Sequence, residues 1–182
     1  MSEVVSRLSA ALDLSLPLVT ALALAVGGIF AVLMARWRGW AFGASFVTGA
    51  GAAMYLAVTL SPSASGPGFP GFHCVVQPLA GLLHPGTGAA FNLLIMAPIG
   101  IGLALLGTSL PVAATISASL ALFVEVMHGM VPAIGRICDT QDAAANFVGA
   151  LIGWLMVRFI QSLWARARAK RSVPQPAIST GS

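Results

Sequence analysis

Five apolar runs, each close to 20 residues long, constrain the fold more than any other feature of this sequence. A helix that crosses a bilayer needs about 20 mostly apolar residues, because each residue adds only about 1.5 Å along the axis. Hydrophobic residues make up 58% of the chain and charged residues 8%, whereas a soluble domain carries about 25% charged residues. The sequence therefore predicts an all-α, polytopic transmembrane helix bundle of about five spans, at 16–35, 40–60, 89–106, 111–129 and 143–163.

The net charge of +4 does not by itself indicate a nucleic-acid-binding protein. The basic residues lie in two short groups beside apolar runs, where topology signals are found, and no basic face with interleaved aromatic residues is visible. We therefore expect no nucleic-acid partner. The N-terminus is not typical of a cleaved signal peptide, because its apolar run is too long for a signal core and no A-x-A site follows. We expect this run to be retained as the first span.

The distribution of Lys and Arg predicts the orientation of the bundle. Arg36 and Arg38 lie between the first two spans, the 61–88 loop has no Lys or Arg, and four basic residues follow the fifth span: Arg166, Arg168, Lys170 and Arg171. Cytoplasmic loops carry an excess of Lys and Arg, and five spans place both basic groups on one side. We therefore expect a multi-pass protein of the cell membrane with its N-terminus outside and its C-terminus in the cytoplasm.

This topology divides the chain into five parts. They are an N-terminal extracytoplasmic segment (1–15), two transmembrane helices (16–60), an extracytoplasmic loop (61–88), a three-helix core (89–163) and a basic cytoplasmic tail (164–182).

The remaining polar residues gather at the outer end of this topology. They come from three spans and the loop at 130–142: Asn92, Glu125, His128, Arg136, Asp139, Asp142 and Asn146. A charge in a membrane is costly and normally faces the bundle interior or a water-filled cavity. We infer a shared polar pocket. Its candidate catalytic residues are Glu125, Asp139 and Asp142, and its candidate ligand-binding residues are Asn92, His128, Arg136 and Asn146.

Positions 139, 142, 146, 149 and 153 step by three or four residues, so they form one stripe if the segment is helical. The first half of the stripe is polar. The second half is the G-x-x-x-G pattern of GALIG at 149–153, which allows two helices to approach closely. The simplest arrangement packs the fourth span against the fifth, with this stripe facing Glu125 and His128.

Each polar residue also has a purely structural interpretation. Asp139 and Asp142 fit a helix N-cap followed by an acid at the third helical position. Arg136 could do no more than neutralise the charge of the aspartates. The two asparagines could hold helices together, and His128 could lie at the membrane interface without a functional role. Glu125 is the hardest to explain in this way, because it is a lone acid in an apolar helix.

Cys74 and Cys138 both fall in predicted outer loops, on the oxidising side of a membrane. We predict a disulfide between them that ties the 61–88 loop over the segment from Arg136 to Asp142. Two free thiols are the alternative. No C-x-x-C or H-E-x-x-H spacing is present, so we expect no metal site and no cofactor.

Three segments together resemble the VanZ-like membrane family: FNLLIMAPIGIGLALL at 91–106, LFVEVMHG at 122–129 and RICDTQDAAANFVGALIGWLM at 136–156. The family pattern is an Asn followed by Pro-x-Gly, then a Glu near the end of the next span, then R, D, D, N, G and G in order. The matching residues are Asn92, Pro98, Gly100, Glu125, Arg136, Asp139, Asp142, Asn146, Gly149 and Gly153. His128 departs from the pattern, in which glutamine is expected. The resemblance implies an association with low-level resistance to the glycopeptide teicoplanin.

Three functions fit these observations. The first is an envelope protein whose outward-facing pocket binds or modifies a lipid-linked cell-wall intermediate or a lipid head group, with Arg136 on a phosphate and Glu125 or an aspartate as general base. The second is a small transporter or proton-coupled channel, although transporter sites usually lie near the midplane. The third is a structural membrane subunit. We favour the first, with membrane lipids as expected partners, and leave open whether the protein is an enzyme.

Overall fold

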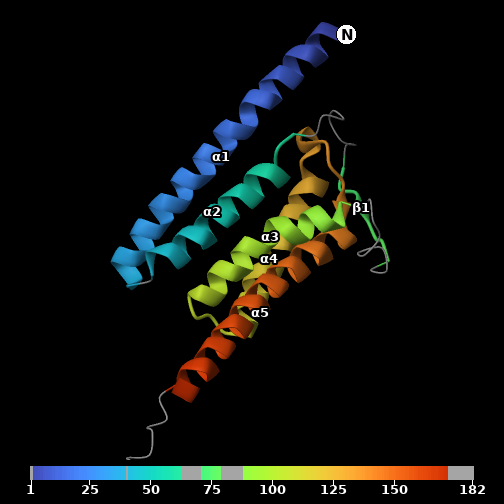
Figure 1. Ribbon diagram of the computed structural model, residues 1–182. Coiled ribbons are helices and arrows are strands. Elements are labelled where there is room, and N and C mark those ends of the chain that lie inside the picture. Colours follow the sequence, from blue (N-terminus) through green and yellow to red (C-terminus); the bar gives the residue numbers. More distant parts are fainter. Residues whose placement is uncertain (1, 40, 63–70, 79–87, 172–182) are drawn as a thin grey trace, which may run out of the picture.

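A computed structural model of the chain describes residues 2–39, 41–62, 71–78 and 88–171, with side chains between residues 20 and 169 of these ranges. The described part contains five α-helices: α1 (Ser2–Arg38), α2 (Phe42–Thr59), α3 (Ala89–Leu105), α4 (Leu110–Met130) and α5 (Thr140–Arg171) (Figure 1). Two strands of two residues each, β1 (Cys74–Val75) and β2 (Cys138–Asp139), pair in parallel, and a 3-10 helix, η2 (Pro132–Ile134), follows α4. The prediction of an all-helical bundle is confirmed.

Four of these helices are long and apolar enough to cross a membrane, judged by length and composition. They are the Thr20–Arg38 part of α1, α2, α4 and the Thr140–Ala169 part of α5. α3 is apolar but has 17 residues, and a helix of that length is about 25 Å long. α1 begins well before the predicted span at 16–35, and α5 ends well beyond 163. The difference arises because hydropathy marks the apolar part of a helix and not its ends.

The helices pack in the spatial order α1, α2, α3, α5, α4. The contact between α3 and α5 depends on the two glycines of the GALIG segment. A Cβ atom on Gly149 would overlap the carbonyl oxygen of Leu93, and one on Gly153 would overlap that of Ala97. The missing side chains let the two main chains touch, which is the close approach that the G-x-x-x-G pattern indicates.

The partner of this glycine stripe is α3, whereas the sequence analysis placed the whole stripe against the fourth span. That prediction is wrong for the glycine half. The physical reason is that α3 carries its own interface glycine, Gly100, whose Cβ position is occupied by the main chain of Ala150. Small residues thus meet on both sides of the α3–α5 contact. α4 has a single glycine, Gly129, at its last turn.

The two ends of the bundle differ in character (Figure 1). The N-terminus, the end of α2, β1 and the start of α5 lie at one end, which we call the polar end. The opposite end holds the α3–α4 turn and the last turn of α1 with Arg36 and Arg38, and α5 continues past it with Arg166 and Arg168. Both basic groups therefore share an end of the molecule. The orientation of that end in a membrane stays a prediction.

Large buried side chains fill the space between the helices. They are Tyr55, Met96, Ile99, Val124 and Trp154. The Trp154 ring nitrogen Nε1 donates to the carbonyl oxygen of Thr108, in the α3–α4 turn, at 3.3 Å. The core therefore fixes the relative heights of α3, α4 and α5, on which the geometry of the polar end depends.

Candidate functional site

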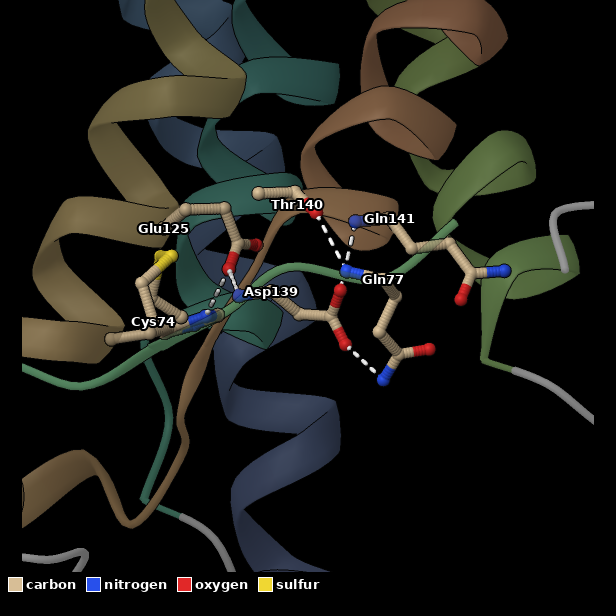
Figure 2. The surroundings of a disulfide bond; sticks show 8 residues. Cys74, Gln77, Glu125, Asp139, Thr140 and Gln141 are labelled. Atoms are coloured by element: carbon tan, nitrogen blue, oxygen red, sulfur yellow. Dashed lines mark hydrogen bonds and ion pairs between the residues drawn. A yellow bond between two sulfur atoms is a disulfide. The ribbon is translucent and has the colours of Figure 1, made fainter. Parts of the chain in front are cut away.

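A disulfide at the polar end joins the 71–78 segment to the residues that precede α5. Cys74 is bonded to Cys138, and the strands pair with Cys74 opposite Cys138 and Val75 opposite Asp139 (Figure 2). The backbone N–H of Gln77 adds a hydrogen bond to Thr140 Oγ1 at 3.1 Å. The predicted disulfide is confirmed. Residues 63–70 and 79–87 of the same loop lie outside the described part of the chain.

Asp139 caps helix α5. Its Oδ1 accepts the backbone N–H of Gln141 at 2.8 Å, so Asp139 is the N-cap residue and Asp142 is the third residue of the helix. Its Oδ2 accepts a hydrogen bond from Gln77 Nε2 at 2.8 Å (Figure 2). Both carboxylate oxygens therefore serve the fold. The geometry favours the structural interpretation of Asp139 over a catalytic one.

Reduction of the disulfide should release the 71–78 segment and leave the helices folded. The strands pair over only two residues each, so the cross-link supplies most of the constraint on this segment. After treatment with dithiothreitol, we expect faster hydrogen exchange at the Gln77 amide and unchanged exchange in α3 and α5, measured by mass spectrometry. Cys74→Ser should behave like the reduced protein and show no further response to reductant. Undiminished protection of Gln77 in either sample would contradict this expectation.

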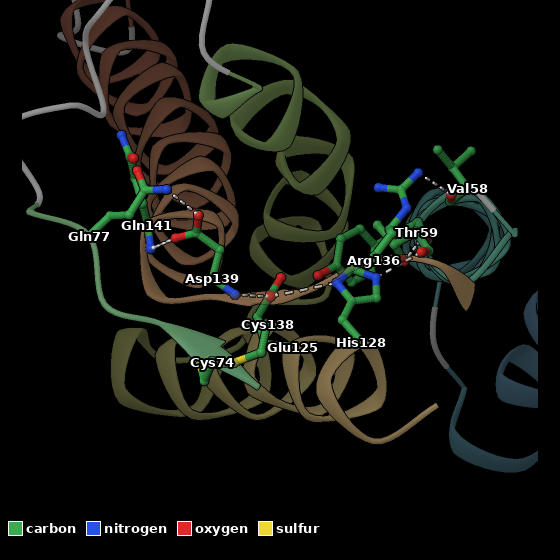
Figure 3. Close-up of polar contacts among 11 residues, drawn as sticks. Val58, Thr59, Cys74, Gln77, Glu125, His128, Arg136, Cys138, Asp139 and Gln141 are labelled. Atoms are coloured by element: carbon green, nitrogen blue, oxygen red, sulfur yellow. Dashed lines mark hydrogen bonds and ion pairs between the residues drawn. A yellow bond between two sulfur atoms is a disulfide. The ribbon is translucent and has the colours of Figure 1, made fainter. Parts of the chain in front are cut away.

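Glu125 and His128 form a buried pair that connects α4 to α2 and to β2 (Figure 3). Their residues are 3% and 6% exposed. His128 Nε2 lies 2.8 Å from the carbonyl oxygen of Thr59, and His128 Nδ1 lies 3.6 Å from Glu125 Oε2. The same carboxylate oxygen accepts the backbone N–H of Asp139 at 2.8 Å. The Glu125 carboxylate thus contacts the His128 ring within α4 and the backbone of Asp139 in β2.

The contact with Thr59 fixes one ring hydrogen of His128. A carbonyl oxygen only accepts hydrogen bonds, so His128 Nε2 carries a hydrogen where it faces Thr59. The other ring nitrogen, Nδ1, faces the Glu125 carboxyl group at 3.6 Å. An imidazole beside a carboxyl group is an arrangement suited to acid–base chemistry.

Asp142 adds a second acid beside this pair and links it to α3. Its carboxyl group is hydrogen-bonded to the side chain of Asn92, and it lies within electrostatic range of Glu125 and His128. Asp142 and Asn92 are partly exposed, while Glu125 and His128 are buried. The cluster thus has an accessible rim, formed by α3 and α5, and a buried interior.

Three buried polar atoms at the polar end have no hydrogen-bond partner within the described part of the chain. They are Tyr55 Oη, Gln141 Nε2 and Asn146 Oδ1. The Tyr55 hydroxyl is close enough to Glu125 and Asp142 to interact with their charges. Buried polar groups are normally paired, and an unpaired one costs about 1–3 kcal/mol. These atoms therefore indicate a place for water or for a polar group of a ligand.

Arg136 turns away from the aspartates. Its guanidinium nitrogen Nη2 lies 3.5 Å from the carbonyl oxygen of Val58, in the last turn of α2 (Figure 3), where a cation interacts favourably with the helix dipole. With His73 and His128 it lines a cleft of about 10 Å³, which has room for about one water molecule. The interpretation of Arg136 as a counter-charge for the aspartates has no support in this geometry.

The structure brings five predicted site residues into one cluster, with Arg136 at its edge: Asn92, Glu125, His128, Asp139 and Asp142. Asn146 is buried one turn further along α5. Sequence reasoning missed two contributions from α2, Tyr55 and the carbonyl group of Thr59. Tyr55 is the only tyrosine of the chain and lies in an apolar helix, which could have drawn attention to it. Among the described residues, no group of three or more His, Cys, Asp and Glu side chains is placed to hold a metal ion.

The apolar helices and the acids gathered at one end define a helical membrane protein with a polar cluster at its rim. The model of the VanZ/LLP1 family matches residues 54–161, so the chain belongs to this family and the resemblance seen in the sequence is confirmed. The match extends beyond the three-helix core and includes Tyr55, Thr59 and the loop that carries Cys74. No curated protein and no solved structure matches the chain.

Proposed function

We propose that the polar end binds the head group of a lipid-linked component of the bacterial envelope, in a multi-pass protein of the cell membrane that turns this end outward. The observation that carries the proposal is the unpaired, buried hydroxyl group of Tyr55 beside two acids, Glu125 and Asp142. Packing alone would favour apolar side chains here, because unpaired buried polar atoms destabilise the folded state. A bound group that supplies the missing hydrogen bonds accounts for the cluster.

The chemistry of the cluster favours a ligand that has several hydrogen-bond donors. Carboxylates accept hydrogen bonds, and Asp142 and Glu125 provide two of them close together. Sugar hydroxyl groups and amines are donors of this kind. Arg136, exposed at the neighbouring cleft, suits a phosphate oxygen. If the bound component is also modified, Glu125 is the general base, because it is the acid that lies beside His128.

The transporter hypothesis has less support. Transporter sites usually lie near the middle of the membrane, often at broken helices. Below the polar cluster, α5 meets α3 through Gly149 and Gly153, whose main-chain contacts leave no room between these two helices. A head-group site at the end of the bundle needs no such path. Membership of the VanZ/LLP1 family makes reduced teicoplanin susceptibility the phenotype to test.

Asp142→Asn should abolish ligand binding and keep the fold. Asparagine has the same shape and can still accept a hydrogen bond from Asn92, but it lacks the negative charge. Binding is measured as retention of a polyprenyl-diphosphate-linked cell-wall intermediate by the purified protein in native mass spectrometry. The phenotype is measured as the teicoplanin susceptibility of cells that express the variant. The unfolding midpoint should equal that of the unmodified chain.

Tyr55→Phe separates binding from structure in the same assay. Removing the hydroxyl breaks no hydrogen bond within the described part of the chain, so the unfolding midpoint should stay the same or rise, while retention of the intermediate should fall. Gln161→Ala, an exposed change beyond the α3–α4 turn, is the control. Full retention by both Asp142→Asn and Tyr55→Phe would refute the proposal. Loss of folding in both would favour a structural role.

A further inference from the structure

A shallow apolar groove lies between α4 and α5 next to the polar cluster. Its volume is about 210 Å³. It is lined by three residues of α4 and three of α5, four of which are alanines: Ala118, Ala121, Leu122, Ala143, Ala144 and Phe147. The lining is apolar, and Leu122 at its edge is 59% exposed. The groove therefore opens on the outer surface of the bundle.

The small residues here have a different effect from the glycines between α3 and α5. There the main chains touch, whereas here the alanines leave space between two neighbouring helices. Leucine at Ala118 or Ala144, which are both partly exposed, would fill the groove with little change in helix propensity. The bilayer interior holds no water, so in a membrane the space is filled by hydrocarbon. The groove is thus shaped for a chain that comes from the lipid phase.

The groove leads to the acids of the polar end. Ala118 and Ala121 precede Glu125 by seven and four residues, so all three lie on one side of α4. On the other wall, Ala143 follows Asp139 by four residues. The upper end of the groove therefore lies at the point where the N–H of Asp139 meets the Glu125 carboxylate, 2.8 Å apart. A lipid chain in the groove would bring its head group to these residues.

We propose that this groove holds the first part of the hydrocarbon chain of the lipid whose head group is bound at the polar end. The inference rests on the proposed function and adds a second subsite to it, one that selects a lipid-anchored form of the ligand over a free head group. Contact between chain and groove is a packing interaction, since the chain is surrounded by hydrocarbon whether bound or not. The groove therefore positions the lipid, and the polar cluster recognises it.

Photo-labelling tests the groove directly. The probe is a polyprenyl phosphate with a diazirine on its chain close to the phosphate, placed in phosphatidylglycerol nanodiscs with the purified full chain. Labelled peptides are mapped by mass spectrometry. We expect residues 118–122 and 143–147 to be labelled more strongly than the exposed face of α1. The labelling of α1 measures contact with bulk lipid. Ala118→Leu and Ala144→Leu should each abolish that excess, because leucine fills the groove.

Ala25→Leu is the matched control, since it adds the same side chain to an exposed position of α1 and should leave the excess unchanged. Equal labelling of the groove and α1, or an excess that survives both groove variants, would overturn the inference. A stable dimer with an unlabelled groove would overturn it in favour of a second copy. Asp142→Asn and Tyr55→Phe distinguish the two proposals: if both keep full retention while the groove variants lose the excess, only the head-group assignment fails.

Discussion

Gly149→Val should prevent stable folding of the bundle, and this is the largest effect on stability that we expect. A side chain at position 149 would have to occupy the space of the Leu93 carbonyl group, because the main chains of α3 and α5 touch there. Backbone atoms cannot rotate out of the way as a flexible side chain can. We expect the free energy of unfolding to fall by about 3 kcal/mol or more. The hydrogen bond between Asn92 and Asp142 would be lost with the contact.

The measurement is the unfolding midpoint of the purified protein in detergent, followed as loss of the monodisperse peak in size-exclusion chromatography after heating. Gly28→Val is the matched control, because a Cβ atom at that position of α1 meets no atom within 4 Å. Glycine and valine differ little in helix propensity compared with such a clash, so the control should unfold near the midpoint of the unmodified chain. Equal midpoints for the two variants would contradict the close packing of α3 on α5.

The helices could be predicted from the sequence because a bilayer imposes a minimum length on every apolar run. α2, α3 and α4 follow the predicted runs to within two residues at each end. The ends of α1 and α5 could not be predicted in this way. The last turns of α5 are rich in Ala, Arg and Lys, which are good helix formers, so the helix continues after the hydropathy has fallen.

The candidate site was predictable where a side chain carries the chemistry. Glu125, a lone acid in an apolar helix, and the two cysteines in loops predicted to lie outside were identified for physical reasons that need no structure. A stripe of residues indicates a face but not its partner, which is why Gly149 was assigned to the wrong helix. Thr59 acts through its main-chain carbonyl group, which every residue has. Tyr55 gains its place only because α2 packs beside α3.

Glu125→Gln should abolish retention of the lipid-linked intermediate and restore teicoplanin susceptibility, without loss of stability. The glutamine side-chain oxygen can still accept the N–H of Asp139, and its amide group can face His128 Nδ1, so both neighbours of the carboxylate keep a partner. What is lost is the acid group, which a neutral amide replaces. The variant is measured in the native mass spectrometry, susceptibility and unfolding assays used for Asp142→Asn.

Glu125→Leu is the contrasting change that makes this test decisive. Leucine leaves the N–H of Asp139 and the Nδ1 atom of His128 without a partner, so the free energy of unfolding should fall by about 2 kcal/mol or more. A carboxylate kept only for packing would give a different pair of results: Glu125→Gln would bind and fold normally, and Glu125→Leu alone would be impaired. The expected pair of results is that Glu125→Gln loses binding but keeps stability, and that Glu125→Leu loses both. This pair would identify Glu125 as a ligand-binding group and exclude a purely structural role for it.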